Sequence, residues 1–222
     1  MAAGPLRDTY AGYRERLVEK LRIKGISDLS VLEAVAQTPR HLFVPEALRS
    51  QAYEDTSLPI GSGQTISQPS THAMYLQTLC LTGKERVLEV GTGTGYQTAL
   101  LARLADVVIS IERVGDLARR AREVLEGMGI GNVTVITGDG SLGRRSLGPY
   151  DRILVAAAGP AVPKPLIEQL AENGRMVIPL ERDGRQELYQ LLRSKNEVIE
   201  THLGSAQFVP LIGKHGFEGD QT

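Results

Sequence analysis

The chain is poor in the residues that form disulfides and clustered metal sites. Cys80 is the only cysteine among 222 residues, so neither an intrachain disulfide nor a site with several cysteine ligands is possible. The four histidines lie far apart in the sequence and show no HExxH spacing; they are His41, His72, His202 and His215. No metal site is therefore expected.

Long apolar runs and an excess of charge are also missing. The longest nearly apolar segment, 153–162, contains Gly and Pro and is too short to span a bilayer. Residues 1–8 show no basic segment leading into an apolar one, so no signal peptide is expected. The chain has 25 basic and 26 acidic residues, a balance that argues against a large nucleic-acid surface. We expect a cytoplasmic monomer that binds neither membranes nor nucleic acids.

The first third of the chain is predicted to be helical. Apolar residues at helical spacing from Tyr10 to Leu21 indicate one helix, and Asp28 is placed to cap a second helix that ends before Pro39. Residues 53–69 are predicted to form a loop. A loop of this length in a compact domain is usually functional or disordered.

Strands and helices alternate in the middle of the chain. After a helix capped by Ser70, apolar runs predict strands at 86–90, 107–111, 133–137, 152–156 and 175–178. Helices are expected between them, through Leu104, over 115–127 and near 163–171. The runs 187–193 and 197–203, with a polar turn at Asn196, predict an antiparallel edge hairpin.

These patterns predict a single α/β domain with a doubly wound, mainly parallel sheet covered on both faces. Residues 1–82 would supply N-terminal helices and a functional loop, 83–182 a ligand-binding core, and 183–222 the antiparallel edge strands and a tail. The hydrophobic content of 41% is ordinary for a globular protein of this size.

A glycine-rich turn follows the first strand of the predicted core. The segment Val87-Leu-Glu-Val-Gly-Thr-Gly-Thr-Gly95 has the pattern of a strand, a glycine turn and a helix start, which lets a ligand approach the backbone closely. The dinucleotide pattern GxGxxG would require a glycine at Tyr96. Glu89 would repel a pyrophosphate and suits a cationic ligand. Both observations disfavour an NAD-dependent oxidoreductase.

Two more acidic residues follow the next two strands. Glu112 ends the second strand, where a carboxylate can accept both ribose hydroxyls of an adenosine. Asp139 follows the third strand between two glycines. Each acid alone could be a solvated loop residue. Three of them at the carboxyl edge of one sheet, together with the glycine turn, favour a ligand site.

This combination resembles the class I S-adenosylmethionine-dependent methyltransferases over residues 83–180, a resemblance that implies a Rossmann-like fold. It also implies that Glu89 lies near the methionyl part of the cofactor, that Glu112 binds the ribose and that Asp139 lies near the adenine. We expect S-adenosylmethionine to be bound by Glu89, Gly91, Thr92, Gly93, Glu112, Arg113, Asp139 and Gly140.

The predicted loop narrows the resemblance to one family. Its sequence, Leu58-Pro-Ile-Gly-Ser-Gly-Gln-Thr-Ile-Ser-Gln-Pro69, is similar to the signature of the protein-L-isoaspartate O-methyltransferases. Further similarities, in family order, are Pro39-Arg40, Tyr150-Asp151, Arg175-Met-Val-Ile-Pro179 and Phe208-Val-Pro-Leu211. The resemblance implies an enzyme that methylates the α-carboxylate of isoaspartyl residues in damaged proteins and peptides, and so initiates their repair through a succinimide.

The resemblance also implies roles on the acceptor side. Ser67 is expected to supply the active-site hydroxyl, and the acceptor is expected to contact Thr65, Ile66, Ser67, Phe208 and Val209. For His72, a ligand contact and a position on a helix surface stay equally open. The residue before Phe208 is often Arg in the family, and Gln207 here leaves a charge contact open.

The expected chemistry agrees with the absence of a His–Asp or other nucleophile–base motif from the sequence. A carboxylate with a pKa of about 4 is ionised at pH 7, so its attack on a sulfonium methyl group needs no general base. Two alternatives stay open: a methyltransferase for a small-molecule or nucleic-acid acceptor, and a non-catalytic adaptor that binds S-adenosylmethionine. The Gln-Thr-Ile-Ser loop disfavours the first, and Ser67 with the complete acid series disfavours the second.

Overall fold

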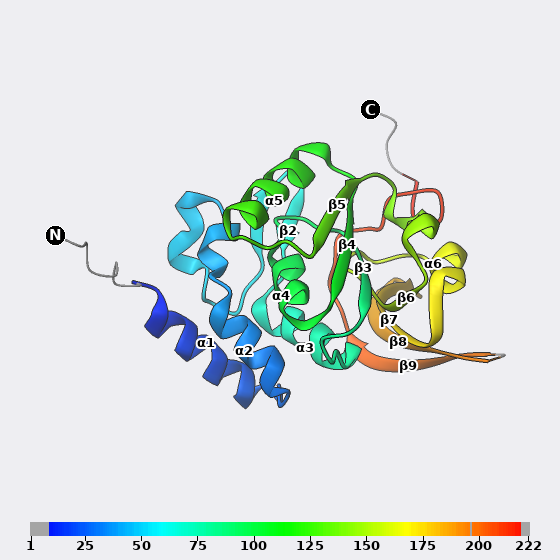
Figure 1. Cartoon of the computed structure of the whole chain (residues 1–222), viewed down its shortest axis with the longest axis horizontal. Helices are drawn as coiled ribbons and strands as arrows, with labels where there is room; N and C mark the ends of the chain where they lie inside the picture. The colour runs from blue at the N-terminus through cyan, green and yellow to red at the C-terminus, as the bar shows by residue number, and fades with distance from the viewer. Residues whose placement is uncertain (1–8, 196, 219–222) are drawn as a thin grey trace.

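A seven-stranded sheet forms the centre of the computed structural model, which describes residues 9–195 and 197–218 (Figure 1). Its strand order is β5-β4-β3-β6-β7-β8-β9. The parallel strands are β3 (Arg86–Val90), β4 (Val107–Glu112), β5 (Val133–Thr137), β6 (Tyr150–Val155) and β7 (Leu170–Arg182). At one edge, β8 (Arg185–Ser194) and β9 (Glu197–Ser205) continue the sheet antiparallel. The predicted parallel sheet and edge hairpin are confirmed. The predicted turn residue Asn196 and the segment 1–8 lie outside the described residues.

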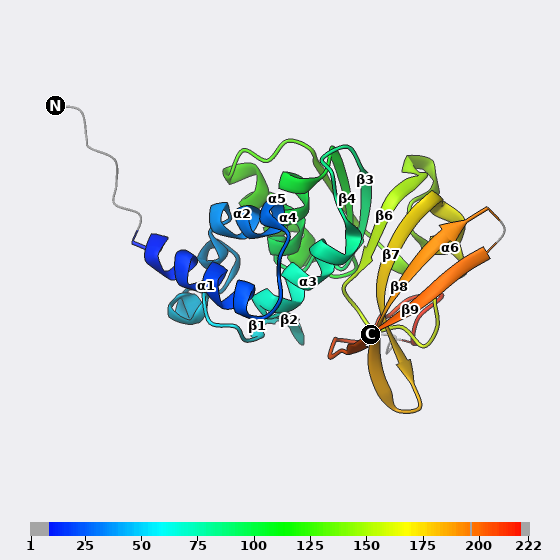
Figure 2. The ribbon, with the colours of Figure 1, turned by 90° about the horizontal axis from the view of Figure 1, so that it is seen from below.

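Helices cover the two faces of the sheet unequally. They are α1 (Ala11–Ile23), α2 (Leu29–Gln37), α3 (Pro69–Leu79), α4 (Tyr96–Leu104), α5 (Gly115–Gly127) and α6 (Lys164–Gln169). The first five lie on one side of β7–β9 in Figure 2, whereas α6 lies on the other. No helix in the described part of the chain has the length and apolar character needed to cross a bilayer.

Alternation along the strands explains why both faces are covered. Val87 and Leu154 belong to the core that includes the first five helices, while their neighbours Leu88 and Ile153 belong to the core with α6. Successive side chains of a strand point to opposite faces, so an uninterrupted apolar strand is stable only between two layers.

Of the two predicted helix caps, one is confirmed and one is wrong. Asp28 caps α2 as predicted, because its carboxylate accepts hydrogen bonds from the N–H groups of Ser30 and Val31. By contrast, α3 begins at Pro69 with Gln68 as its N-cap, so the predicted cap at Ser70 is wrong. Proline suits the first helical position because its missing N–H would have no intrahelical partner there.

The segment predicted as a loop contains a small hairpin. Strands β1 (Leu58–Gly61) and β2 (Gln64–Ile66) pair antiparallel across a turn in which Gly61, Ser62 and Gly63 all have positive φ. The side chains of Leu58, Ile60 and Ile66 are buried in the helical core. Burial of these side chains therefore holds the segment in place over the carboxyl ends of the strands.

Candidate active site

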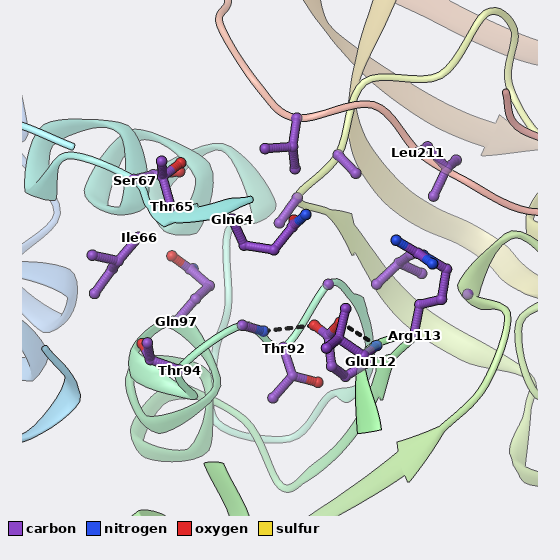
Figure 3. A pocket seen from close by; sticks show the side chains of 18 of the residues that line it. Gln64, Thr65, Ile66, Ser67, Thr92, Thr94, Gln97, Glu112, Arg113 and Leu211 are labelled. Carbon is purple, nitrogen blue, oxygen red and sulfur yellow. Dashed lines mark hydrogen bonds between the residues drawn. The ribbon is translucent and has the colours of Figure 1, made fainter. Parts of the chain in front are cut away.

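The site lies where the direction of the sheet reverses. From β3 the chain proceeds outward to β4 and β5 and then returns to β6, which pairs with the other edge of β3. Open α/β sheets bind ligands at the carboxyl ends of their strands at such a reversal. A cavity of about 100 Å³ lies there, between the glycine turn, β2 and residues 209–212 (Figure 3).

The glycine turn makes close contact with the neighbouring strand end. Gly91 has φ +95°, and a Cβ at this position would lie 3.4 Å from the Cβ of Ala156, just after β6. A Cβ at Gly140, after β5, would overlap the side chain of Val90. Glycine at these two positions therefore lets the segments that follow β3 and β5 pack closely against the neighbouring strand ends beside the cavity.

Glu112 connects the end of β4 to the glycine turn. Its carboxylate accepts hydrogen bonds from the N–H groups of Gly93 at 2.8 Å and Val114 at 2.9 Å, drawn as dashed lines in Figure 3. The side chain is 7% exposed and lines the cavity, as does Arg113. Each carboxylate oxygen has a second lone pair, so the group can still accept hydrogen bonds from a diol.

Glu89 lies beneath the glycine turn and does not line the cavity. Its carboxylate accepts hydrogen bonds from the hydroxyls of Thr98 at 2.5 Å and Ser110 at 2.6 Å, and Ser110 in turn contacts the hydroxyl of Thr92. Burial raises the pKa of Glu89 to about 7. Only Thr92 connects this network to the cavity wall.

Asp139 holds the C-terminal segment against the sheet. Its carboxylate accepts hydrogen bonds from the N–H groups of Ser141 at 2.9 Å and Lys214 at 2.7 Å. The neighbouring Gly140 lines the cavity, whereas the side chain of Asp139 does not. The three acids thus occupy three different positions: Glu112 in the cavity wall, Glu89 below it and Asp139 beside it.

The residues expected on the acceptor side lie on the opposite wall. Thr65, Ile66, Ser67 and Val209 all line the cavity. Thr65, Ser67 and Val209 also line a second cavity of about 640 Å³, whose wall includes Phe208 and Gln207. None of the described residues that line this second cavity carries a charge. The structure therefore brings all five expected acceptor residues to two adjoining spaces that share one wall.

His72 is a buried residue of the cavity wall. It is 9% exposed, its Nδ1 is hydrogen-bonded to the side chain of Gln97, and its ring contacts the edge of Tyr96. Burial, followed by the positive charge of Arg40, lowers the pKa of His72 to about 3, so the ring is neutral at pH 7. Its position excludes the helix-surface alternative.

Sequence reasoning missed many residues of the cavity wall. They are Gln64, Val90, Thr94, Tyr96, Gln97, Ile111, Val114, Ala156, Ala157 and Ile212. Those that flank a predicted strand end, such as Ile111 and Ala156, could have been found from their position next to the motifs. Gln64, which extends from β2 toward the cavity in Figure 3, could have been found as the first residue of the Gln64-Thr-Ile-Ser67 motif.

The lining fits an adenosyl ligand such as S-adenosylmethionine. Glu112 supplies acceptors for hydroxyl groups, while Ile111, Val114 and Leu211 supply apolar surface for a planar base. The glycine turn allows close backbone approach. These residues can hold the group without a metal, and no cluster of three or more ligating side chains is found in the described ranges.

Comparison with known proteins identifies the family. The profile of the protein-L-isoaspartate(D-aspartate) O-methyltransferase family matches residues 12–216. The chain belongs to this family. It is 47% identical to the protein-L-isoaspartate O-methyltransferase of Syntrophus aciditrophicus, over 96% of this chain and 100% of that protein. It is 49% identical to the enzyme of the same name from Methanoculleus marisnigri, over 93% of this chain and 94% of that protein.

Solved structures of the family have the same fold. A protein-L-isoaspartate O-methyltransferase with 31% identity superposes with a TM-score of 0.84 over 91% of this chain and 67% of that chain. A Plasmodium falciparum structure described as an enzyme of this family, in complex with S-adenosyl-L-homocysteine, is 30% identical. It superposes with a TM-score of 0.78 over 90% of this chain and 98% of that chain. The class I methyltransferase fold expected from the glycine turn and the three acids is confirmed.

Proposed function

We propose that this protein methylates the α-carboxylate of isoaspartyl residues in damaged proteins and peptides, with S-adenosylmethionine as the methyl donor. The observation that carries the proposal is the wall formed by Thr65, Ser67 and Val209. These three residues line both an adenosyl-type cavity and a larger uncharged cavity of about 640 Å³, so the spaces for the methyl donor and for the peptide adjoin at this point. Family membership supports the same reaction.

The chain's own residues align the reactants and exclude water. When bound, S-adenosylmethionine supplies an electrophilic methyl group on its sulfonium. Glu112 accepts hydrogen bonds from the ribose of the cofactor, and Arg113 and the glycine turn line the rest of the cofactor site. The hydroxyl group of Ser67 donates a hydrogen bond to the acceptor carboxylate. That carboxylate is ionised at pH 7, so no residue has to remove a proton. Fixed orientation of two reactants can supply several kcal/mol of the lowered barrier.

Phe208 and Val209 form the side of the second cavity that faces Ser67. The N–H and C=O groups of Phe208 are hydrogen-bonded to the side chain of Gln186, and Val209 accepts a hydrogen bond from the N–H of Ala158. The Phe208 ring stacks on Tyr75 with 5.4 Å between ring centroids. This apolar surface would pack against the peptide that carries the isoaspartate.

Paired peptides test the proposal. The protein is incubated with S-adenosylmethionine labelled in its methyl group and with two peptides that differ only by isoaspartate or aspartate at one position. We expect base-labile label on the isoaspartyl peptide alone. Label on neither peptide would contradict the proposal and favour another acceptor or a non-catalytic adaptor, and equal label on both would contradict the assigned specificity.

Further expectations from the sequence stay predictions. They are the cytoplasmic location, the monomeric state, the absence of nucleic-acid and membrane partners, and the organisation of residues 1–222 as one domain with three segments. We propose that the monomer is sufficient for activity, because both cavities are lined by residues of one chain. A molar mass of one chain in light scattering, measured on an active sample, is the expected result.

A further inference from the structure

A buried arginine lies next to the acceptor wall, which is the part of the site formed by Thr65, Ser67 and Val209. Arg40 begins a short 3-10 helix (Arg40–Phe43) and is 0% exposed. No carboxylate of the described residues lies within ion-pair distance of Arg40. The charge of Asp55 acts on it from farther away, and that carboxylate is bound by Lys24 and by the N–H of Ser70. A cation without a paired charge in the interior loses several kcal/mol of hydration, so its remaining interactions have to be strong.

Those interactions are with backbone carbonyl groups of the active-site loop. The guanidinium donates hydrogen bonds to the carbonyl oxygens of Ala52 at 2.6 Å and Ser67 at 2.9 Å, with a longer contact to Thr56 at 3.5 Å. Ala52 and Thr56 precede the β1–β2 hairpin, and Ser67 follows it. One planar, rigid group therefore connects the two ends of the segment that carries the acceptor wall.

The groups around Arg40 belong to the same wall. Its Cζ lies 5.6 Å from the centre of the Tyr96 ring, and its charge helps to keep His72 neutral. Tyr96, His72 and Ser67 all line the first cavity. Arg40 itself lines neither cavity, so any effect it has on a bound reactant acts through these neighbours.

We propose that Arg40 is a positioning residue for methyl transfer. Its guanidinium fixes the Ser67 carbonyl, and thereby sets where the Ser67 hydroxyl points relative to the acceptor carboxylate. This proposal rests on the proposed function for its kinetic part, and on the carbonyl contacts for its structural part.

Arg40→Lys is the test variant, since lysine keeps the charge but cannot span the two carbonyls with a planar fork. We expect the maximal rate on a saturating isoaspartyl peptide to fall about tenfold, with cofactor affinity changed less than about threefold. Arg152→Lys is the matched control. Arg152 also donates to backbone carbonyls, those of Leu79, Cys80 and Asp151, but lies at the opposite end of the strands from the cavities. Its rate should stay within about twofold of wild type.

A double-mutant cycle separates positioning from general destabilisation. If Arg40 acts through Ser67, then Arg40→Lys should lower the rate by less than about threefold when Ser67 is already alanine. Full additivity of the two effects would overturn the proposal. So would an unchanged rate in Arg40→Lys, or an equal loss in Arg152→Lys.

Hydrogen exchange supplies a readout that does not require activity. In Arg40→Lys the N–H groups of residues 52–67 should exchange faster than in wild type, while those of the sheet strands stay protected. Unchanged exchange over this segment would overturn the structural part. A wild type that methylates no isoaspartyl peptide would contradict the proposed function, and the exchange data would still decide whether Arg40 holds the loop.

Discussion

The two walls of the active site are built in different ways. On the cofactor side, Gly91 and Glu112 stand directly at the ends of buried parallel strands, whose backbone hydrogen bonds determine where they lie. On the acceptor side, Ser67 and Val209 come from segments more than 140 residues apart and lie outside the main sheet. Side chains help to hold these segments: Arg40 binds the Ser67 carbonyl and Gln186 binds the backbone of Phe208, while Ala158 adds backbone hydrogen bonds to Val209 and Leu211.

This difference predicts how amino-acid substitutions in each wall affect the enzyme. A strand end is stabilised by the whole sheet, so loss of the Glu112 side chain removes a contact to the ligand and the acceptor of the Gly93 N–H, but leaves the strand in place. A segment held by a few hydrogen bonds from side chains moves when one of them is lost. Changes on the cofactor side should therefore act mainly on binding, and changes on the acceptor side mainly on the rate of transfer.

The largest effect is expected for Ser67→Ala. A hydrogen bond to a charged group contributes roughly 1.5–3 kcal/mol, so its loss should lower single-turnover methylation of an isoaspartyl peptide about ten- to hundredfold. Cofactor affinity should change less than about fivefold, because the adenosyl contacts lie on other strands. Full turnover in the variant would refute the role of Ser67, and a parallel collapse of cofactor binding would make it a cofactor or folding residue.

Glu112→Ala should have the corresponding effect on the cofactor side. Loss of a charged acceptor for two ribose hydroxyls should weaken S-adenosylmethionine binding by roughly 1–3 kcal/mol, measured by calorimetry. Glu112→Gln is a second variant: it keeps one acceptor oxygen, but its NH2 group replaces the acceptor of either the Gly93 or the Val114 N–H, so cofactor affinity should fall here too. Unchanged affinity in Glu112→Ala would exclude the ribose assignment.

The raised pKa of Glu89, which lies beneath the glycine turn, should make the stability of the protein depend on pH. Burial raises its pKa from 4.5 to about 7, so the folded state keeps a proton that the unfolded state releases above pH 4.5. This stabilisation is complete below pH 4.5 and is lost as pH rises through 7. From pH 6 to pH 8 we expect wild type to lose about 1 kcal/mol of unfolding free energy relative to Glu89→Gln. Equal losses in denaturant titrations of both proteins would contradict this assignment.

The smallest effect is expected for Asp139→Ala. Its carboxylate binds the N–H groups of Ser141 and Lys214, and its side chain does not line the cavity. Cofactor affinity should fall less than about fivefold, while the N–H of Lys214 should exchange faster with solvent. A loss as large as that of Glu112→Ala would instead indicate direct contact with the adenine. Normal affinity would mean that the acid only holds the turn and the tail.

Prediction from sequence succeeded where local pattern and final structure agree. The strands Arg86–Val90 and Val133–Thr137 and the helix Gly115–Gly127 have the bounds that their apolar patterns predicted. Strand β7 was predicted to begin at residue 175 but begins at Leu170, and its pairing with β6 is irregular there. The irregular stretch contains Asn173, which has positive φ, and Gly174, and such residues mark a bulge that an apolar run alone does not predict.

The acceptor side of the site was only partly predicted from the sequence. The motif Gln64-Thr-Ile-Ser67 was recognisable, but the hairpin that carries it was not, because its strands of four and three residues are too short to show a clear alternating pattern. The burial of His72 was not predicted, although its spacing of three and seven residues from Tyr75 and Leu79 places it on the buried face of α3.

The sequence by itself determined the parallel sheet, the glycine turn, the order of the three acids and the family. Each is encoded by neighbours along the chain: apolar runs, glycines that permit positive φ, and acids at strand ends. The tertiary structure alone decided that Glu112 faces the cavity while Glu89 lies beneath it, and that Arg40 closes the active-site loop. These choices depend on hydrogen bonds between segments distant in the sequence, such as Arg40 to Ser67, whose geometry exists only after the chain has folded.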